Sequence, residues 1–401
     1  MEKKDLKLNI QYSILHVTFW CVMAAATLYV VPLLRAKGLS ETQIGIALAT
    51  KYISSMLAQV IISYFADKYI RIFTLKRIVI ALCLLCFPVT IWFYFTEGSL
   101  LKAMVVLAFF GGCVNGAAAF VNTIAARFAD AGRKLRFSYA RGIGSISWGI
   151  ASVIISYVVD NTHVEIILFL QAAMLLFMIM AVLALEPVPL PIQAEKTEAK
   201  SHSYLYLLSH NIGFSIFLLS SILLFLGYTL QTVFLIDIVT NVGGGNVELG
   251  YVELVQSVCE LLPAVLYVWM IKKRSSYQIL RICGVACFAM IFSVMMSGRV
   301  IHLMLLQLFD IFGYGMYWPV SVDYISQTID KNDWVKGQAL ICVCSLGAGG
   351  TIGSIFGGSI MQVAGIEGLL KISTGLALLG VILMFVAMWM DEKKSRRLET
   401  S

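Results

Sequence analysis

The sequence predicts an all-α integral membrane protein, with twelve transmembrane helices in two pseudo-symmetric bundles of six. The first observation is composition: 59% of the 401 residues are apolar and 13% are Asp, Glu, Lys or Arg, against about 45–50% and about 25% in an ordinary soluble domain. The mean hydropathy is +0.86. A soluble fold of this length cannot bury so much apolar surface, so composition excludes a soluble enzyme, a nucleic-acid-binding protein and a disordered chain.

The second observation is a series of apolar stretches of about 20 residues or more, the length that crosses a bilayer as a helix. We expect twelve such helices, with approximate spans 10–34, 43–66, 76–95, 100–127, 138–159, 164–185, 206–238, 247–271, 278–297, 301–326, 338–363 and 368–390.

The third observation is the distribution of positive charge. Of the 30 lysines and arginines, 23 fall in segments on one side of the predicted membrane or in the helix ends beside them, five fall in or beside the opposite loops, and Lys51 and Arg141 are counted as lying inside helices. The positive-inside rule therefore predicts that both termini are cytoplasmic. Topology accounts for the net charge of +7, so no nucleic-acid partner is implied. We expect a multi-pass protein of the plasma membrane.

A long polar stretch divides the helices six and six. It predicts a cytoplasmic linker at residues 191–205, between bundles at residues 1–190 and 206–401. Basic loops follow the second and eighth helices, and charged loops follow the fourth and tenth. Two six-helix halves related by a parallel repeat are a known plan of secondary transporters.

Local patterns support some boundaries. Ser40 and Gln43 fit a capping box that opens the second helix. Glycines that recur every fourth residue predict close helix packing in the fourth and eleventh helices: Gly112, Gly116, Gly349, Gly353 and Gly357.

All nine cysteines fall within predicted membrane helices. Cys83 and Cys86 form a CxxC motif, yet no His or carboxylate lies near them with ligand spacing. We therefore interpret the cysteines as buried free thiols, and we expect neither a metal site nor a cofactor.

Three ionisable residues lie deep in predicted helices, where charge is costly and usually faces a cavity or a partner. At about 1.5 Å per residue, Lys51 lies roughly 12–15 Å into the second helix, Glu260 about 18–20 Å into the eighth, and Asp310 about 13 Å into the tenth. Glu260 favours a role with protons or substrate. Lys51 either neutralises Glu260 or Asp310 or acts directly in function, and Asp310 is the other candidate carboxylate for such a pair.

Arg141 and Trp148 share a face of the fifth helix, two turns apart. A guanidinium that donates paired hydrogen bonds and an indole that stacks on a ring suit a polyhydroxylated ligand. The alternatives are that Arg141 binds a phospholipid at the membrane edge and that Trp148 only packs.

Several polar and aromatic residues complete the candidate set. Glu253, Gln256 and Glu260 share a face of the predicted eighth helix, and Asn115 and Asn122 share a face of the fourth. Trp20 and Trp318 are candidates for lining a cavity, with aromatic packing as the alternative. His16 in the first helix is interpreted as a hydrogen-bonded packing residue.

Two segments of the chain resemble the major facilitator superfamily. Residues 57–68 (LAQVIISYFADK) are similar to its second-helix and loop signature, which implies a gating role for Asp67 and Lys68. Residues 139–148 (YARGIGSISW) resemble the fifth-helix motif of the branch that includes the lactose permease, nucleoside–proton symporters and phenylpropionate permeases. This resemblance implies that Arg141 and Trp148 contact a sugar.

A third segment, residues 256–260 (QSVCE), is similar to the eighth-helix segment of this branch, in which a glutamate takes part in binding or coupling. This resemblance implies the same role for Glu260. The chain also departs from the pattern. Ser63 stands where the loop signature has glycine, Asn122 lies near the position of a sugar-binding glutamate, and Asp310 replaces a histidine. These departures remove the full coupling set of a galactoside permease.

Our leading hypothesis is a proton-coupled symporter of a neutral hydroxylated solute, an oligosaccharide or a nucleoside, that works by alternating access and is a monomer. Arg141, Trp148, Asn122, Asn115, Trp20, Gln256 and Trp318 are the candidate solute-binding residues, and Glu260, Asp310 and Lys51 are the candidates for proton coupling. The alternative is a proton-driven exporter of amphipathic drugs or metabolites. A membrane receptor or scaffold is a third, weaker reading, and no nucleophile–base pair suggests an enzyme.

Overall fold

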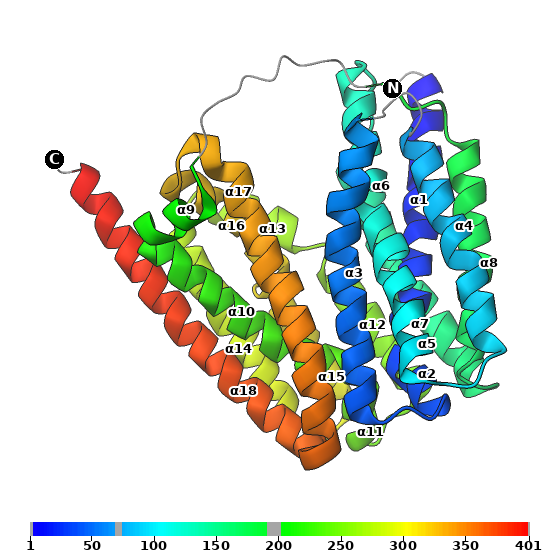
Figure 1. Cartoon of the computed structure of the whole chain (residues 1–401). Coiled ribbons are helices and arrows are strands. Elements are labelled where there is room, and N and C mark those ends of the chain that lie inside the picture. Colours follow the sequence, from blue (N-terminus) through cyan, green and yellow to red (C-terminus); the bar gives the residue numbers. More distant parts are fainter. Residues whose placement is uncertain (1–2, 69–73, 191–201, 400–401) are drawn as a thin grey trace. The chain divides into compact units, whose positions relative to one another are not determined.

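The computed structural model describes residues 3–68, 74–190 and 202–399, and all regular secondary structure in these ranges is helical (Figure 1). Contacts divide the chain into two compact units. Unit 1 comprises Met1–Glu195 and Asn246–Ser257, and unit 2 comprises Lys196–Gly245 and Val258–Ser401. The segment Asn246–Ser257 therefore packs with unit 1, although it follows the linker in sequence.

Unit 1 is a bundle in which α1 packs against α7 and α8, α4 against α8, and α3 against α5 (Figure 1). Its helices are α1 (Lys3–Ala25), α2 (Val30–Ala36), α3 (Glu41–Lys68), α4 (Leu75–Tyr94), α5 (Leu100–Phe109), the π-helical turn η1 (Phe110–Asn115), α6 (Gly116–Asp130), α7 (Phe137–Asp160), α8 (Ile166–Ala184) and most of α12 (Asn246–Cys259).

Unit 2 is a bundle in which α18 packs along α10 and α14, and α14 packs against α16. Its elements are α9 (Tyr204–His210), α10 (Ile212–Val233), α11 (Leu235–Asn241), α13 (Pro263–Met270), α14 (Ser276–Met295), α15 (Val300–Leu306), η2 (Gln307–Ile311), α16 (Tyr314–Thr328), η3 (Lys331–Asp333), α17 (Trp334–Cys342), η4 (Val343–Gly349) and α18 (Gly350–Glu399).

Ten helical segments of the described residues are long and apolar enough to cross a membrane. Two junctions explain the difference from the twelve predicted spans. The predicted eighth helix is split into α12 and α13, and the predicted eleventh and twelfth helices are joined in one helical run that turns at Gly365 (φ 61°). The twelve-helix fold class is consistent with this arrangement.

Several predicted helices are interrupted. The first consists of α1 and α2, the seventh of α9, α10 and α11, and the tenth of α15, η2 and α16. In the eighth, Pro263 has no N–H to donate and its ring clashes with the preceding turn, so α12 ends at Cys259 and α13 begins at Pro263. In the tenth, Gly313 leaves the helical region (φ −89°, ψ −113°). Our expectation of continuous helices was wrong at these points.

At one end of unit 1, segments predicted to be cytoplasmic come together. Arg133 in the loop after α6 pairs with Asp5 at 2.8 Å and with Glu186 at 3.2 Å. These carboxylates accept hydrogen bonds from the guanidinium and raise the pKa of Arg133 above its usual value. At the opposite end, Lys37 Nζ donates to the carbonyl oxygens of Tyr94 and Thr96. Loops predicted to lie on the same side of the membrane therefore meet at the same end of unit 1.

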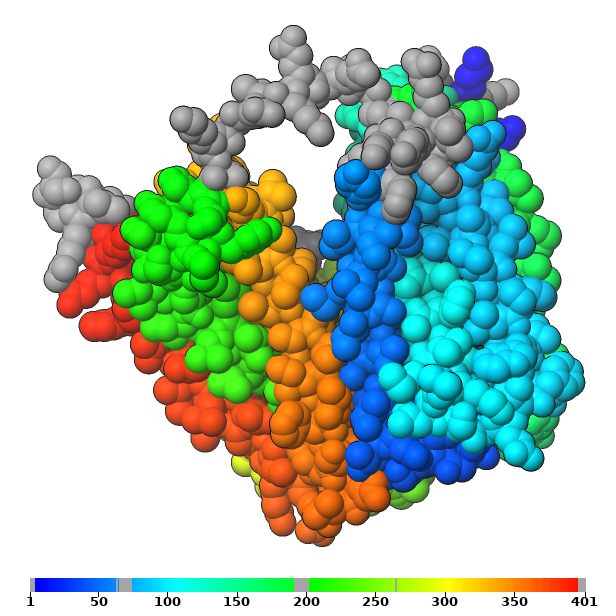
Figure 2. Space-filling view, viewed as in Figure 1, coloured from blue at the N-terminus to red at the C-terminus, as the bar shows by residue number. Residues whose placement is uncertain are grey.

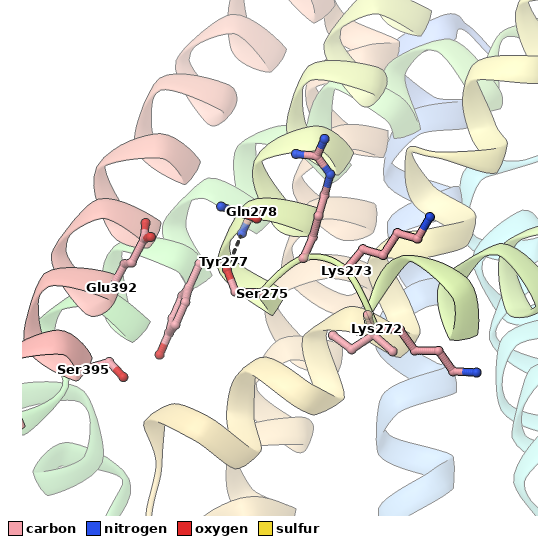
Figure 3. A pocket seen from close by; sticks show the side chains of 9 residues that line it. Lys272, Lys273, Ser275, Tyr277, Gln278, Glu392 and Ser395 are labelled. Carbon is pink, nitrogen blue, oxygen red and sulfur yellow. Dashed lines mark hydrogen bonds between the residues drawn. The ribbon is translucent and has the colours of Figure 1, made fainter. Parts of the chain in front are cut away.

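In unit 2, the basic loop Lys272–Arg274 borders a concavity of about 480 Å³ that is also lined by the end of α18 (Figure 3). Lys272 and Lys273 point away from Glu392 in this view, and Lys273 Nζ lies 4.4 Å from the Trp269 ring centroid. The loop after the predicted eighth helix and the end of the predicted twelfth therefore share one end of the unit.

The capping box and the glycine pattern of the predicted eleventh helix are present, whereas a Cβ at Gly112 or Gly116 would make only an ordinary contact with Ala58. Ser40 N–H donates to Gln43 Oε1 at 3.0 Å and Gln43 N–H donates to Ser40 Oγ at 3.4 Å, which confirms the capping box. Gly349, Gly353 and Gly357 face α10 so closely that a Cβ at each would lie 2.9–3.1 Å from its side chains. This glycine face serves helix packing.

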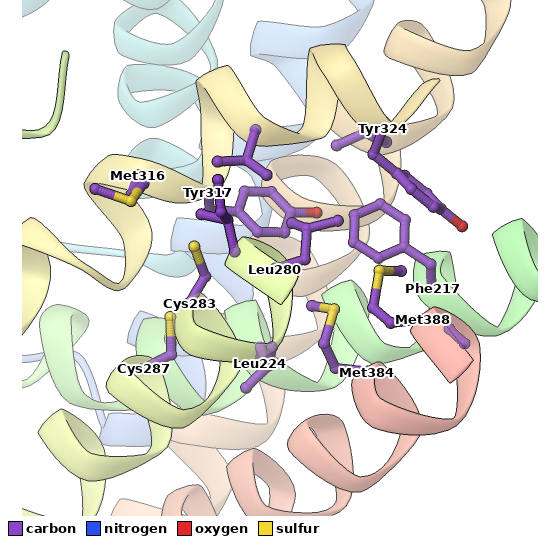
Figure 4. Packing of buried hydrophobic residues seen from close by; sticks show 14 of the residues in the cluster. Phe217, Leu224, Leu280, Cys283, Cys287, Met316, Tyr317, Tyr324, Met384 and Met388 are labelled. Atoms are coloured by element: carbon purple, nitrogen blue, oxygen red, sulfur yellow. The ribbon is translucent and has the colours of Figure 1, made fainter. Parts of the chain in front are cut away.

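The core of unit 2 is apolar and rich in aromatic rings and sulfur (Figure 4). Polar groups inside it are paired: Tyr317 and Ser221 share a hydrogen bond of 2.6 Å, and Tyr324 donates to Asp391 Oδ2 at 2.5 Å. The nine cysteines are free thiols. Most are buried as predicted, but Cys342 is exposed.

Apolar side chains also cover much of the surface, as expected of helices that face lipid. The helix α3, blue in Figure 2, lies at the surface of unit 1 and exposes Ile53, Leu57 and Val60. Residues 66–68, which close this helix, are not described beyond their backbone.

Helix packing in unit 1 depends on one glycine more than on its neighbour. A Cβ at Gly111 would overlap the carbonyl oxygen of Lys51 and Oγ of Ser54, whereas a Cβ at Gly112 would make an ordinary 3.5 Å contact with Ala58. We expect Gly111→Ala to destabilise the purified protein by about 1–3 kcal/mol through overpacking, and Gly112→Ala to have little effect. Thermal unfolding in detergent measures both, and equal midpoints would contradict the prediction.

Candidate functional site

The first candidate site lies where α1 faces α7. The guanidinium carbon of Arg141 is 4.0 Å from the Trp20 ring centroid, a cation–π geometry. Arg141 Nη1 also donates to Ser145 Oγ at 2.6 Å, one turn further along α7. Gly144 makes room for the indole, because a Cβ there would overlap the Trp20 ring. Arg141 is thus held by side chains of the protein itself.

Trp148 extends this cluster along the same face of α7. Its ring centroid lies 6.0 Å from that of Trp20, with the planes inclined by 72°. Its Nε1 donates to Oε2 of Glu253, on α12, at 2.8 Å. We name Trp20, Arg141, Trp148 and Glu253 the indole–arginine group, and all four belong to unit 1.

The docking of α12 on α7 positions Glu253. Gly149 and Gly250 lie at close approaches where a Cβ would come within about 3 Å of the opposing helix. The hydroxyls of Tyr157 and Tyr251 also share a hydrogen bond of 2.7 Å. Together these contacts place the Glu253 carboxylate against an indole N–H of the neighbouring helix.

The indole–arginine group combines aromatic surface with both kinds of hydrogen-bonding group. It holds one guanidinium and one carboxylate, so its formal charges cancel. Trp20, Arg141, Trp148 and Glu253 are all half-buried. Trp20 Nε1 is buried and has no hydrogen-bond partner among the described residues. Such a group can stack on a flat ring while donating to and accepting from hydroxyls.

Lys51 is buried in unit 1, and its side chain binds the backbone where the chain is interrupted between α1 and α2. Its ammonium donates to the carbonyl oxygen of Ala26 at 3.1 Å and to Thr27 Oγ1 at 2.9 Å. A cation at the C-terminal end of a helix satisfies released carbonyls and matches the helix dipole. Both hydrogen bonds stay within unit 1, so these contacts give Lys51 a structural role.

Glu260 and Asp310 form a second candidate site, in unit 2. Asp310 lies in η2 and is 2% exposed, and its Oδ1 has no hydrogen-bond partner among the described residues. Glu260 is exposed, in the break between α12 and α13. The two carboxylates are close enough for their charges to interact. Each therefore lies where its predicted helix is interrupted.

This break corrects one expectation. We expected Glu253, Gln256 and Glu260 to share a helix face, but α12 ends at Cys259. Glu253 therefore belongs to the indole–arginine group, whereas Glu260 lies in unit 2. The cause is Pro263, which prevents the regular turn that would align them.

The structure shows different surroundings for the predicted amide residues. Asn115 ends η1 half-buried, with Oδ1 buried and unpartnered among the described residues, and Asn122 is exposed on α6. No hydrogen bond in the described ranges joins either amide to the group. Gln256 is half-buried on α12.

Three other residues of the predicted set remain. Trp318 is half-buried, with its ring centroid 5.7 Å from that of Phe225 and 5.5 Å from that of Tyr317, so it packs against the unit 2 core. Asp67 and Lys68 close α3, but their side chains lie outside the described residues.

Sequence reasoning missed three features of the first site. Ser145 was not identified as a partner of Arg141, although it lies one turn away, and Glu253 was not identified as a partner of Trp148. His16 was expected to be hydrogen-bonded. It is fully buried between Tyr12 and Phe137, and neither ring nitrogen has a hydrogen-bond partner in the part of the chain that is described.

Comparison with known proteins identifies the class. The profile of the MFS_1 like family matches residues 9–369, so the chain belongs to this family, and its predicted place in the major facilitator superfamily is confirmed. It is a membrane transporter of a small-molecule solute rather than an enzyme. A search of the curated proteins found no match.

Solved structures of transporters share the fold. The nucleoside transporter NupG has a TM-score of 0.77 at 16% identity, over 96% of this chain and 98% of that one. A point mutant of NupG has a TM-score of 0.78 at 14% identity, over 96% and 99%. A bacterial homologue of the human lysosomal transporter Spinster has a TM-score of 0.68 at 11% identity, over 99% and 98%.

The Trp148–Glu253 hydrogen bond is expected to couple the two residues energetically. Trp148→Phe removes the N–H donor and Glu253→Ala removes the acceptor, and each should lower the stability of the ligand-free protein. Because both changes break one bond, the double variant should be less destabilised than the sum, with a coupling energy of about 0.5–3 kcal/mol. Unfolding in detergent measures the cycle, and additive effects would show that the bond contributes nothing.

Proposed function

We propose that this transporter is a proton-coupled symporter of a neutral hydroxylated solute, either a nucleoside or an oligosaccharide. The observation that carries the proposal is the indole–arginine group, which offers two aromatic faces, a fixed guanidinium and a carboxylate in one place. Its balanced charges favour a neutral solute over an ion. The likeness to NupG makes nucleosides the first class to test.

The chemistry of the group fits such a solute. A nucleobase or the apolar face of a sugar stacks on an indole, and the hydroxyls of the sugar pair with Arg141 and Glu253. Trp20 Nε1 supplies a further donor. Asn115, Asn122, Gln256 and Trp318 stay in the proposal as residues that bind solute at other stages of the cycle.

Proton coupling is assigned to Glu260 and Asp310. Two neighbouring carboxylates, one of them almost completely buried, repel each other when both are ionised, and a proton on one removes this cost. Transport then proceeds by alternating access, with solute and proton moving together. We further propose a monomer in the plasma membrane with both termini in the cytoplasm.

A ligand panel tests the solute class. Ligands that bind the folded protein raise its thermal stability, so we expect one nucleoside or oligosaccharide to stabilise the purified transporter. Arg141→Ala should weaken that ligand about tenfold or more, because a hydrogen bond to a charged group contributes about 1.5–3 kcal/mol. Arg136→Ala is the control, since its exposed side chain lies just before α7. Stabilisation only by lipophilic cations, unaffected by Arg141→Ala, would indicate the amphipathic-compound exporter instead.

Substitution of Glu260 tests the coupling. Glu260→Gln cannot release a proton, so we expect it to abolish uphill accumulation in proteoliposomes with an imposed pH gradient while solute exchange continues. Asp310→Asn should act in the same direction. Glu367→Gln, at a highly exposed surface position, is the matched control. Accumulation that persists in Glu260→Gln would place the coupling proton elsewhere.

A further inference from the structure

Three potential metal ligands meet at one end of unit 2, in segments that hold none of the residues assigned to transport. They are a ring nitrogen of His202 and carboxylate oxygens of Asp330 and Asp333, and the three atoms lie within 4.8 Å of one another. His202 lies near the end of the predicted linker and is the first residue of it beyond position 190 that the structure describes, and the two aspartates lie between α16 and α17. The fold thus joins two segments about 130 residues apart.

The backbone between α16 and α17 sets the two aspartates side by side. Asp330 immediately precedes the 3₁₀ turn η3, and Asp333 is its last residue. Asp333 N–H donates to the Asp330 carbonyl oxygen at 2.8 Å. In a 3₁₀ helix, side chains three residues apart eclipse one another, so both carboxylates project to the same side.

The imidazole is held in place over these carboxylates. His202 N–H donates to Asp333 Oδ1 at 3.0 Å, and His202 Nδ1 lies 2.8 Å from Asp333 Oδ2. The ring stacks on Tyr206 at a centroid distance of 4.4 Å and an angle of 15°. Asp333 is only 2% exposed. The potential ligands are therefore oriented before any ion arrives.

The charges of the cluster leave a place for a cation. His202 pairs with Asp333, but the carboxylate of Asp330 has neither a hydrogen-bond nor an ion-pair partner among the described residues. The neighbouring cation is Lys336, whose ammonium donates to the His202 carbonyl oxygen and lies 5.4 Å from the Tyr204 ring centroid. No ion pair in the described ranges joins Lys336 to either aspartate.

We propose that His202, Asp330 and Asp333 form a binding site for a divalent transition-metal ion, with Zn²⁺ as the best match. One imidazole and two carboxylates are a donor set that Zn²⁺ accepts, with water as the fourth ligand. Bonds of about 2.0–2.1 Å require ligand atoms about 3.3 Å apart in a tetrahedron. The cluster, with one pair at 2.8 Å and all pairs within 4.8 Å, spans this separation. A bound ion would fasten the end of the linker to the segment between α16 and α17.

The test uses the full-length protein, purified in detergent with any affinity tag removed. Competition with a chromophoric chelator measures Zn²⁺ affinity, and the visible spectrum of the Co²⁺ form reports tetrahedral geometry. We expect one Zn²⁺ per chain and no competition by Mg²⁺, which prefers oxygen ligands in octahedral sites. Asp330→Asn and His202→Gln should each weaken binding at least about tenfold.

Asp330→Asn is the decisive variant, because it alters an exposed carboxylate without a described partner and should leave the metal-free thermal midpoint unchanged. His302→Ala and Asp130→Asn are matched controls, each an exposed residue outside the cluster. Equal Zn²⁺ affinity in wild type and Asp330→Asn, or the absence of stoichiometric binding to the wild type, would overturn the proposal.

Discussion

Every interruption of a helix in an apolar environment releases backbone carbonyls and amides that need new partners, and this constraint governs where charge lies in the protein. Between α1 and α2, the Lys51 ammonium binds a released carbonyl. Glu260 occupies the break between α12 and α13, and Asp310 lies in η2 between α15 and α16. The three deep charges of the sequence thus coincide with irregular backbone, which is where they cost least and have room to act.

The indole–arginine group depends on close helix contacts more than on its own polar bonds. Gly144 admits the Trp20 indole to the surface of α7, and Gly149 and Gly250 bring α12 near enough for Glu253 to meet Trp148. A Cβ at Gly144 would strike the Trp20 indole itself, and a Cβ at Gly149 or Gly250 would push α12 away from α7. The same glycines therefore allow the helices to pack closely and position the side chains of the indole–arginine group.

Hydropathy and charge were enough to predict the fold class and the order of the helical stretches, since a bilayer imposes a length and a polarity on each crossing. The breaks were not predicted, although Pro263 carried a readable signal. The partners were beyond sequence patterns: Trp148 and Glu253 are 105 residues apart, and His202 and Asp333 are 131 apart. Helical spacing relates residues a few turns apart and says nothing about contacts between distant segments.

The turn at Gly365 has a practical consequence for studying this transporter. The whole connection between the predicted eleventh and twelfth helices is a corner in one helical run, at a φ of 61° that side chains rarely tolerate. An epitope or protease site inserted there would have to be built into helical backbone. The loop containing Gly132, which has open space around it and lies between α6 and α7, is the better position for a reporter.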